Sequence, residues 1–403
     1  MISLKRNIGI TFFGTLVFSL SQWGIISAIA KIGGAEKVGI YALALAVVSP
    51  VFSLANLNLR SVQSTDIHRQ YTFIQYRNLR LLTSFTALMV IAIILCMVDY
   101  RSDIEVFIAI FACAKFFESI SELAYGRQQQ SERMHFIAVS MILRGSLAFL
   151  MFSLCYWWMG QLLIAGIGLV VAWAVVALIY DYRQAGQLSR DELPTALPYI
   201  KPLLITTAPL GFVVFCNTIN LNIPRYIISD LYGETQLGIY AGISFFIVVG
   251  ATLINAIGQS ATPRLAKLYF TSRPTFLQLL HKLLAIAFLI GLGGIMGSYL
   301  LGEWVLAMFY NNEYRGYGGL FVWVMTGGMM MYCSAIIGCG LTAMRSFKIQ
   351  SWLSLVVISI VAAVSFYSIP IVGLKGGAIA ILLAYSVKFL LTYGFIFSKL
   401  KGA

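Results

Sequence analysis

Charged side chains stand inside segments that are otherwise apolar enough to cross a membrane. Lys115, Glu118 and Glu122 share one predicted helix, and their i, i+3, i+7 spacing places them on one face of it. Arg144 lies inside the next apolar segment, and Lys388 lies near the middle of the last one. An ionised group at the centre of a membrane helix costs at least about 2.5–3.5 kcal/mol, so each needs a partner or a function.

Two interpretations of these charges are open. Lys115, Arg144 and Lys388 can line a cavity that attracts a diphosphate or acidic sugars, while Glu118 and Glu122 bind or exchange a coupling H⁺ or Na⁺. Alternatively, Lys115 and Arg144 pair with the two carboxylates in a structural network. Lys388 has no charged partner within its own segment, which favours substrate binding over a lysine that only extends toward the membrane surface.

Amides and another arginine extend the set. Asn217 and Asn220 precede Pro224 and Arg225 near the end of a predicted helix. Amides and a proline at such a place are typical of a broken helix that borders a wet cavity. Arg225 would then be a bidentate donor for sugar or phosphate at the outer mouth. The alternative is hydrogen bonding between helices, with an arginine that reaches the membrane surface.

Two further groups of polar residues are candidates. Gln22 and Trp23 lie in the middle of the first apolar segment, where they can bind sugar hydroxyls and rings or pack between helices. A predicted cytoplasmic gate, which would meet a diphosphate at the membrane surface, consists of Arg60, Gln63, Asp66, Gln259 and Arg264. The same positions also suit anchoring to anionic lipid.

The elements that position these residues are membrane helices. Of the 403 residues, 60% are hydrophobic and 11% are charged, whereas soluble domains have about 45–50% and 25%. Lipid offers no hydrogen bonds to the backbone, so apolar runs of about 20 residues predict helices. We predict an all-α integral membrane protein with twelve transmembrane helices, near residues 8–30, 38–59, 79–98, 104–124, 135–157, 161–182, 202–222, 237–258, 279–300, 318–342, 352–369 and 376–397.

The sequence repeats itself at half its length. Gly34–Ala42 reads GAEKVGIYA, and Gly233–Ala241, 199 positions later, reads GETQLGIYA. At this offset the 28 positions from Gly34 to Ser61 hold eight identities, which favours duplication over chance. We therefore predict two six-helix lobes related by a parallel repeat, residues 1–200 and 201–403, with a substrate cavity between them.

The basic residues set the orientation. In the twelve-helix arrangement 19 Lys and Arg fall in loops on the side of the termini and 6 on the opposite side. The positive-inside rule then places both termini in the cytoplasm. This placement accounts for the net charge of +13, so nucleic acid is not an expected partner.

Several motifs, taken in order along the chain, resemble the polysaccharide transporter family of lipid-linked oligosaccharide flippases. They are SQWG at Ser21–Gly24, GIYA at Gly39–Ala42, LNLRSVQSTD at Leu57–Asp66, NIPRY at Asn222–Tyr226, GQSATPRLA at Gly258–Ala266, the pair Glu313 and Tyr314, and GLKGGA at Gly373–Ala378. That family belongs to the MOP superfamily, which also holds MATE multidrug exporters and lipid II flippases.

The resemblance implies a secondary transporter with two lobes around a partly cationic cavity. Its substrate would be an undecaprenyl-diphosphate-linked oligosaccharide, the repeat unit of an O-antigen, capsule or exopolysaccharide. Ion-coupled alternating access would move it from the cytoplasmic to the outer leaflet of the bacterial inner membrane, with no cofactor beyond a coupling H⁺ or Na⁺. Expected partners are the substrate, membrane lipids, a polysaccharide polymerase and a chain-length regulator.

Two other functions compete with the flippase. A MATE-like multidrug or cation exporter often carries a carboxylate in its first helix, whereas residues 1–35 contain no Asp or Glu. A polytopic polysaccharide polymerase or glycosyltransferase needs an acid/base pair or a metal site. The longest predicted outer loop, residues 302–317, contains only Glu303, Glu313 and Arg315 as charged residues. Neither catalytic nor metal-binding residues are therefore expected.

Overall fold

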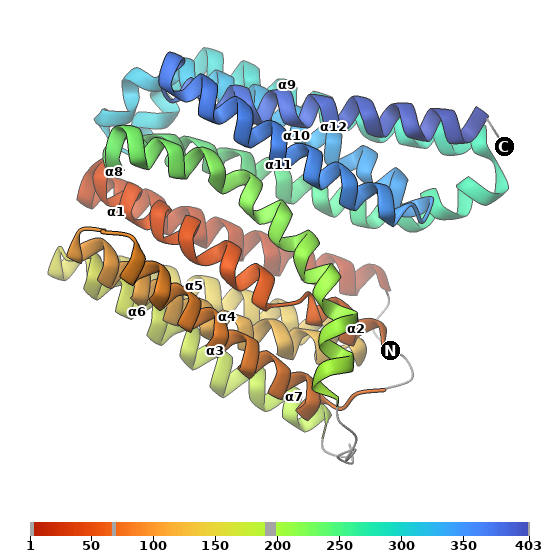
Figure 1. Ribbon diagram of the computed structural model, residues 1–403, viewed down its shortest axis with the longest axis horizontal. Coiled ribbons are helices and arrows are strands. Elements are labelled where there is room, and N and C mark those ends of the chain that lie inside the picture. Colours follow the sequence, from red (N-terminus) through yellow and green to blue (C-terminus); the bar gives the residue numbers. More distant parts are fainter. Residues whose placement is uncertain (1–3, 67–69, 190–198, 402–403) are drawn as a thin grey trace. The chain divides into compact units, whose positions relative to one another are not determined.

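The computed structural model describes residues 4–66, 70–189 and 199–401, and every regular element in them is helical (Figure 1). The elements are α1 (Leu4–Ala55), α2 (Leu59–Thr65), α3 (Phe73–Met97), α4 (Ser102–Gln130), α5 (Met134–Met159), α6 (Leu162–Val175), the π-helix η1 (Val176–Asp181), α7 (Tyr182–Leu188), α8 (Ile200–Thr271), α9 (Arg273–Phe309), the 3₁₀ helix η2 (Asn312–Tyr317), α10 (Gly318–Ala343), α11 (Phe347–Val372) and α12 (Lys375–Lys401). The predicted all-helical class is confirmed.

Nine helical stretches of the described chain are long and apolar enough to cross a membrane. The 29-residue α4 is equally long but carries charges in its interior. The prediction of twelve separate helices is not confirmed, because two pairs of predicted helices each lie within one long helical element that is kinked at a glycine. Residues 8–30 and 38–59 both fall in the 52-residue α1, and residues 202–222 and 237–258 both fall in the 72-residue α8.

A single glycine interrupts each of these long helices. Gly34 has φ 75° and ψ −175°, and Gly233 has φ 76° and ψ −178°. Glycine adopts such positive φ values readily because it lacks a Cβ atom. The two glycines occupy the same position in the sequence repeat, so both copies of the repeat have the same backbone break.

The chain divides into two compact units. The first comprises the residues up to Gly33 together with Ile40–Thr218, and the second comprises Gly34–Gly39 together with Ile219–Ala403. The short segment 34–39 therefore belongs to the second unit although its neighbours in the chain belong to the first.

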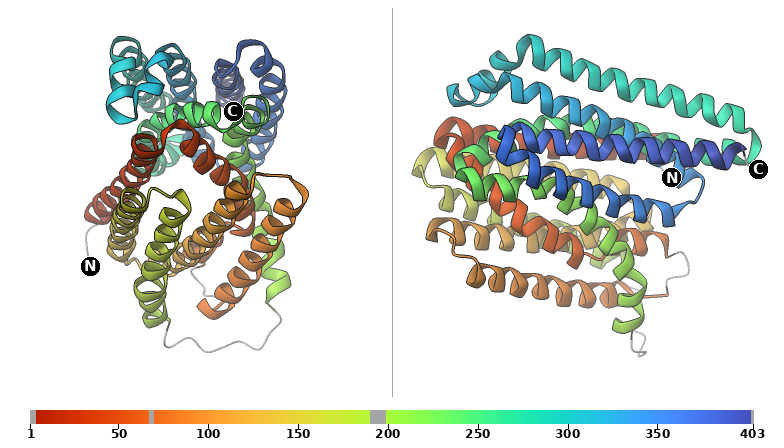
Figure 2. Two further views of the ribbon diagram at one scale, coloured as in Figure 1. Left: turned by 90° about the vertical axis from the view of Figure 1, so that its left-hand side faces the viewer. Right: turned by 45° about the horizontal axis from the view of Figure 1, so that its top comes forward.

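In the first unit α4 is the central helix. It packs against α2, α3, α5 and α6, as the two views in Figure 2 also show. Tyr41 packs its ring against Phe107, Phe111 and Phe152, at centroid distances of 6.2, 5.4 and 6.4 Å. These contacts pack Tyr41 of α1 against Phe107 and Phe111, which lie on the same face of α4 as the charged residues that follow them in the sequence.

In the second unit α10 packs against α9 and α12, and buried tyrosines tie neighbouring elements to α8. The hydroxyl of Tyr310 donates to the Gly242 carbonyl at 2.7 Å, and that of Tyr332 donates to the Ile247 carbonyl at 2.7 Å. Carbonyls inside a helix can accept a second hydrogen bond, so each phenol satisfies its own polar atom without breaking α8.

The two copies of the repeated stretch contact each other within the second unit. A Cβ atom added to Gly39 would collide with the Glu234 carbonyl, and one added to Gly238 would collide with the Ala35 carbonyl. Ala35 corresponds to Glu234 in the repeat, and Gly39 corresponds to Gly238. The contact is thus the same in both directions, as in an interface with two-fold symmetry.

The pair Glu313 and Tyr314, one of the motifs named above, binds both copies. The backbone N–H of Ala35, directly after the break at Gly34, donates to the Glu313 carboxylate at 2.8 Å. The Tyr314 hydroxyl donates to the Gly238 carbonyl at 3.3 Å. Glu313 thus satisfies a backbone donor that the break leaves without its helical acceptor.

The glycine contact predicts a specific sensitivity to small substitutions. Gly39→Ala should lower the free energy of unfolding by about 1–3 kcal/mol, because the new methyl group meets a rigid carbonyl. Gly297→Ala is the matched control, since a Cβ there meets nothing within 4 Å. Thermal unfolding of the detergent-solubilised variants measures the difference; equal melting temperatures for the two variants would contradict the tight contact.

Candidate functional site

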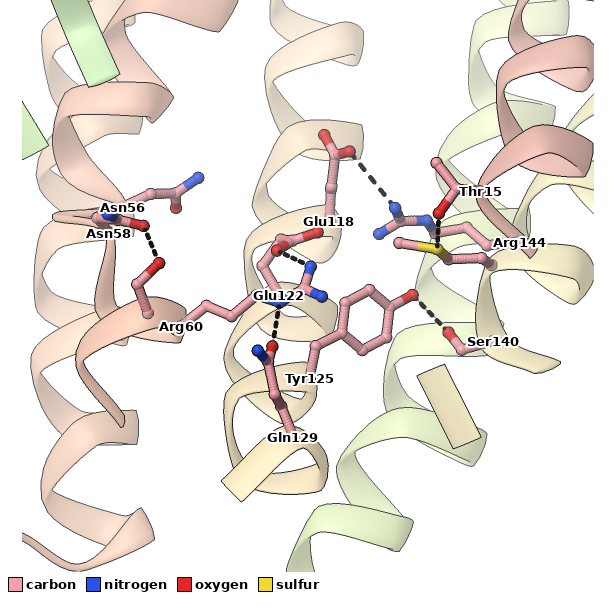
Figure 3. Close-up of polar contacts among 12 residues, drawn as sticks. Thr15, Asn56, Asn58, Arg60, Glu118, Glu122, Tyr125, Gln129, Ser140 and Arg144 are labelled. Carbon is pink, nitrogen blue, oxygen red and sulfur yellow. Dashed lines mark hydrogen bonds and ion pairs between the residues drawn. The ribbon is translucent and has the colours of Figure 1, made fainter. Parts of the chain in front are cut away.

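A network of ion pairs runs along the charged face of α4. The Lys115 ammonium donates to Glu118 Oε2 at 2.5 Å, and Nη2 of Arg144 on α5 lies 3.6 Å from Glu118 Oε1. One turn further along α4, Nη1 of Arg60 on α2 donates to Glu122 Oε2 at 3.1 Å. Figure 3 shows both arginines reaching α4 from neighbouring helices. Three cations and two carboxylates thus meet, with a formal excess of one positive charge.

Aromatic rings surround the cations of this network. The Arg144 guanidinium carbon lies 4.5 Å from the ring centroid of Phe18, 5.7 Å from Tyr125 and 5.6 Å from Trp173. The guanidinium of Arg60 lies 5.2 Å from the Tyr125 centroid. Cations over aromatic faces are attracted by the ring quadrupole, which partly replaces the lost hydration.

Arg144 is buried but only partly satisfied. Its side chain is 2% exposed, and Nε and Nη1 have no hydrogen-bond partner in the described chain. A guanidinium has five N–H donors in a planar fork, which suits bidentate binding of phosphate or carboxylate. The geometry therefore leaves donor capacity at Arg144 beyond its pair with Glu118.

Sequence reasoning missed a carboxyl group close to this network. Asp181, the last residue of η1, is fully buried, and neither of its carboxylate oxygens has a hydrogen-bond partner in the described part of the chain. It stands at the end of the predicted helix 161–182, where a charged residue is ordinary at a membrane surface. The available signal was that Asp181 is the only acidic residue between Leu162 and Leu188.

The predicted gate residues of the first unit, Arg60, Gln63 and Asp66, lie at or near α2. Gln63 is buried, and Arg60 joins the α4 network as described. Asp66 accepts from the backbone N–H of Gln70 at 3.0 Å and from the Tyr76 hydroxyl at 3.3 Å. These contacts of Asp66 hold the chain where α2 ends.

The other first-unit candidates lie on the long helices. Gln22 and Trp23 on α1 are half-buried, and Nε2 of Gln22 has no hydrogen-bond partner in the residues described. Asn217 on α8 is exposed. The ion pairs of the network described above join other residues.

Arg225 and Asn220 of the second unit are buried on α8, at 8% and 2% exposure. The Arg225 guanidinium donates to Asn222 Oδ1 at 3.1 Å, while its Nε and Oδ1 of Asn220 have no partner among the described residues. Lys388 on α12 is half-buried, with its ammonium 5.5 Å from the Tyr385 ring centroid. Within the described chain no carboxylate pairs with Lys388.

Gln259 and Arg264, the second-unit part of the predicted gate, are exposed on α8. Gln259 lines a cavity of about 420 Å³ between α8 and α10, together with Asn255, Thr262 and Thr342. These side chains offer uncharged donors and acceptors, which suit the hydroxyl groups of a sugar.

Comparison with solved structures identifies the fold. The MATE multidrug transporter DinF-BH in complex with R6G superposes with a TM-score of 0.71, at 15% identity, over 98% of this chain and 95% of that one. A single-substitution mutant of the Vibrio cholerae MATE transporter VcmN gives 0.66 at 11% identity over 99% and 97%. The chain is therefore a multi-pass membrane protein with the fold of MOP-superfamily transporters.

Comparison of sequences identifies the family. A family model described as polysaccharide biosynthesis protein matches residues 4–269. The capsular polysaccharide biosynthesis protein CapF of Staphylococcus aureus is 27% identical over 401 residues, which cover 98% of this chain and all of that protein. The chain belongs to the polysaccharide biosynthesis protein family, and the resemblance drawn from its motifs is confirmed.

A double-mutant cycle tests the network on α4. Arg60→Ala, Glu122→Ala and the double variant should give a coupling energy of about 1–3 kcal/mol, because the pair is largely withdrawn from water. The matched control is the more exposed pair Arg101 and Asp103, whose coupling should stay below about 1 kcal/mol. Unfolding measured in one detergent supplies both coupling energies. Equal coupling energies for the two pairs would refute the claim that the ion pair between Arg60 and Glu122 stabilises the first unit.

Proposed function

We propose that this protein is a flippase that moves an undecaprenyl-diphosphate-linked oligosaccharide from the cytoplasmic to the outer leaflet of a bacterial inner membrane. The proposal is carried by the combination of the family and the fold. The family is one of polysaccharide biosynthesis, while the fold is that of membrane transporters. A chain of this fold contributes to polysaccharide synthesis most directly by moving an intermediate, and the repeat unit of a capsule, O-antigen or exopolysaccharide is such an intermediate.

Twelve membrane crossings are part of this proposal. The 52 residues of α1 would span about 78 Å as one straight helix, far more than the ~30 Å hydrocarbon core. We infer that α1 and α8 each cross twice, turning at Gly34 and Gly233. With α4 included, the count is twelve, and the basic loops then place both termini in the cytoplasm. Two lobes, 1–200 and 201–403, would alternate access to the substrate.

The interior cations are the proposed contacts for the diphosphate. Arg144, Lys115, Arg225 and Lys388 lie within helices, and Arg144 and Arg225 each retain buried N–H groups without partners in the described residues. Charge-assisted bonds from such donors are the strongest available to a phosphate. Amides with unpaired atoms, at Gln22 and Asn220, are suited to sugar hydroxyls, and the gate residues would meet the substrate at the cytoplasmic surface.

An ion gradient would drive the cycle. Glu118 and Glu122 are the coupling groups proposed from the sequence, for H⁺ or Na⁺. Both carboxylates are paired with cations. They would therefore exchange an ion only after these pairs open, which links ion exchange to movement of α2 and α5 relative to α4.

Export of small cations is the second candidate, favoured by the likeness to MATE multidrug transporters. The charges of the first unit disfavour it, because the α4 network carries an excess of positive charge that repels a cationic drug. The absence of Asp and Glu from residues 1–35 disfavours it as well.

Reconstitution separates the two functions. Liposomes containing the protein and a fluorescent polyprenyl-diphosphate-linked disaccharide report flipping as new accessibility of the label to a membrane-impermeant quencher. We expect the wild type to flip the label faster than protein-free liposomes, and Arg144→Ala to reduce the rate at least about tenfold. Asp230→Asn, on the exposed surface, is the control. Uptake of ethidium without flipping would support the cation exporter instead.

Lys388→Ala tests the candidate in the second unit. It should reduce surface polysaccharide about tenfold in cells that depend on the variant, while its amount in the membrane stays normal. Lys388→Arg should retain export because it retains the charge. Lys399→Ala, an exposed lysine near the end of the same helix, is the matched control. Full complementation by Lys388→Ala would remove Lys388 from the site.

A further inference from the structure

Asp181 is a buried acid near the α4 network for which no ion pair is found in the described chain. Glu118 and Glu122 each hold a cation, whereas both oxygens of Asp181 are buried without a hydrogen-bond partner in the described chain. The hydroxyls of Ser121 and Ser140 lie near it without making a regular hydrogen bond, and a buried ionised carboxylate with such weak support is strongly disfavoured. The neutral acid needs one acceptor for its proton and is much easier to bury.

The surroundings of Asp181 fit a carboxyl group that changes its protonation state. Its polar neighbours are Ser121 and Glu122 on α4 and Ser140 and Arg144 on α5. The Ser121 hydroxyl is buried without a partner in the described residues and can accept the proton of the neutral acid. The phenols of Tyr125 and Tyr180 complete the titratable groups that act on Asp181.

The backbone at Asp181 is also unusual. Residues 176–181 form a π-helix between α6 and α7. Such turns are rare and occur often at functional sites, because the extra residue per turn redirects the side chains that follow. Here the turn ends at the buried carboxyl, which faces α4 and α5 rather than lipid.

We propose that Asp181 is a proton-exchange site, and that its protonation state selects the partner of Arg144. When Asp181 carries a proton, Arg144 interacts with Glu118. When the proton leaves, the new carboxylate attracts the Nε and Nη1 groups of Arg144, which have no other partner within the described residues. One proton is released and no other covalent bond changes, while Arg144 exchanges its ion-pair partner. The exchange shifts α5 between two pairings with its neighbours. Only the coupling of this exchange to transport rests on the proposed function; the proton site itself does not.

A proton fits this site better than a metal cation. Na⁺ needs several oxygen ligands around a space of its own size, whereas Ser140 Oγ is already hydrogen-bonded to the Tyr125 hydroxyl at 2.7 Å. The nearby guanidinium of Arg144 also repels a bound cation. A proton needs only the carboxyl group and one acceptor.

Infrared difference spectroscopy tests the site directly. The spectra are recorded on the wild type in liposomes while the pH is raised. We expect the C=O band of a protonated carboxyl group to disappear with pH, independently of Na⁺. Asp181→Asn should lack this band, while Glu118→Gln, Glu122→Gln and the surface control Asp230→Asn should keep it. Persistence of the band in Asp181→Asn, or a dependence on Na⁺, would overturn the proposal.

Asp181→Glu keeps the test decisive if Asp181→Asn does not fold, because a longer carboxyl group must shift the frequency of the band. An unchanged band in Asp181→Glu would also overturn the proposal. Flipping of the fluorescent disaccharide lipid under a pH gradient forms the second arm: Asp181→Asn should lose the response to the gradient, and a retained response would overturn the coupling role. If the wild type flips no lipid, the proposed flippase function is refuted. The proton-exchange site is then still tested by the infrared titration.

Discussion

Ions buried between membrane helices must find their partners inside the protein, and this constraint organises the first unit. The carboxylates of α4 draw Arg60 from α2 and Arg144 from α5 toward one helix. In water each ion pair would contribute little to the stability of the fold. In a bilayer, breaking the pair would leave an unpaired charge in an apolar environment. The position of α4 among its neighbours is thus set by ion pairs and aromatic packing along the same helix face.

In the second unit the contacts between α8 and its neighbours are made largely by neutral groups, although Arg225 is buried there as well. Its buried phenols donate to carbonyls of α8, and the Gly39 and Gly238 contacts bring two helices close enough that their backbones touch. Neutral hydrogen bonds and close backbone packing are cheaper to bury than ions, because neither requires the loss of a strong hydration shell. The two units therefore differ in what holds them, although the repeat gives α1 and α8 the same backbone break.

The sequence alone was sufficient to predict those features of the structure that depend on local sequence patterns. Apolar runs predicted the helices, and the spacing of Lys115 and Glu118 correctly placed them on one face. It was insufficient where tertiary contacts decide. The breaks inside α1 and α8 depend on one glycine conformation each, which no apolar pattern reports. Arg60 was interpreted as a gate residue from its place at a helix end, but the structure pairs it with Glu122. Its role at a gate remains a prediction.

The charge balance of the first unit connects structure to transport. Arg60, Lys115 and Arg144 exceed Glu118 and Glu122 by one positive charge, and Asp181 is the group whose ionisation would cancel that excess. Under the proposal above, the net charge of this network therefore changes by one unit with the protonation of Asp181. A diphosphate is an anion, so any site that includes Arg144 must respond to the protonation of Asp181, since two sites that share a charged group are energetically coupled in both directions. Such coupling is what an ion-driven carrier of an anionic lipid requires.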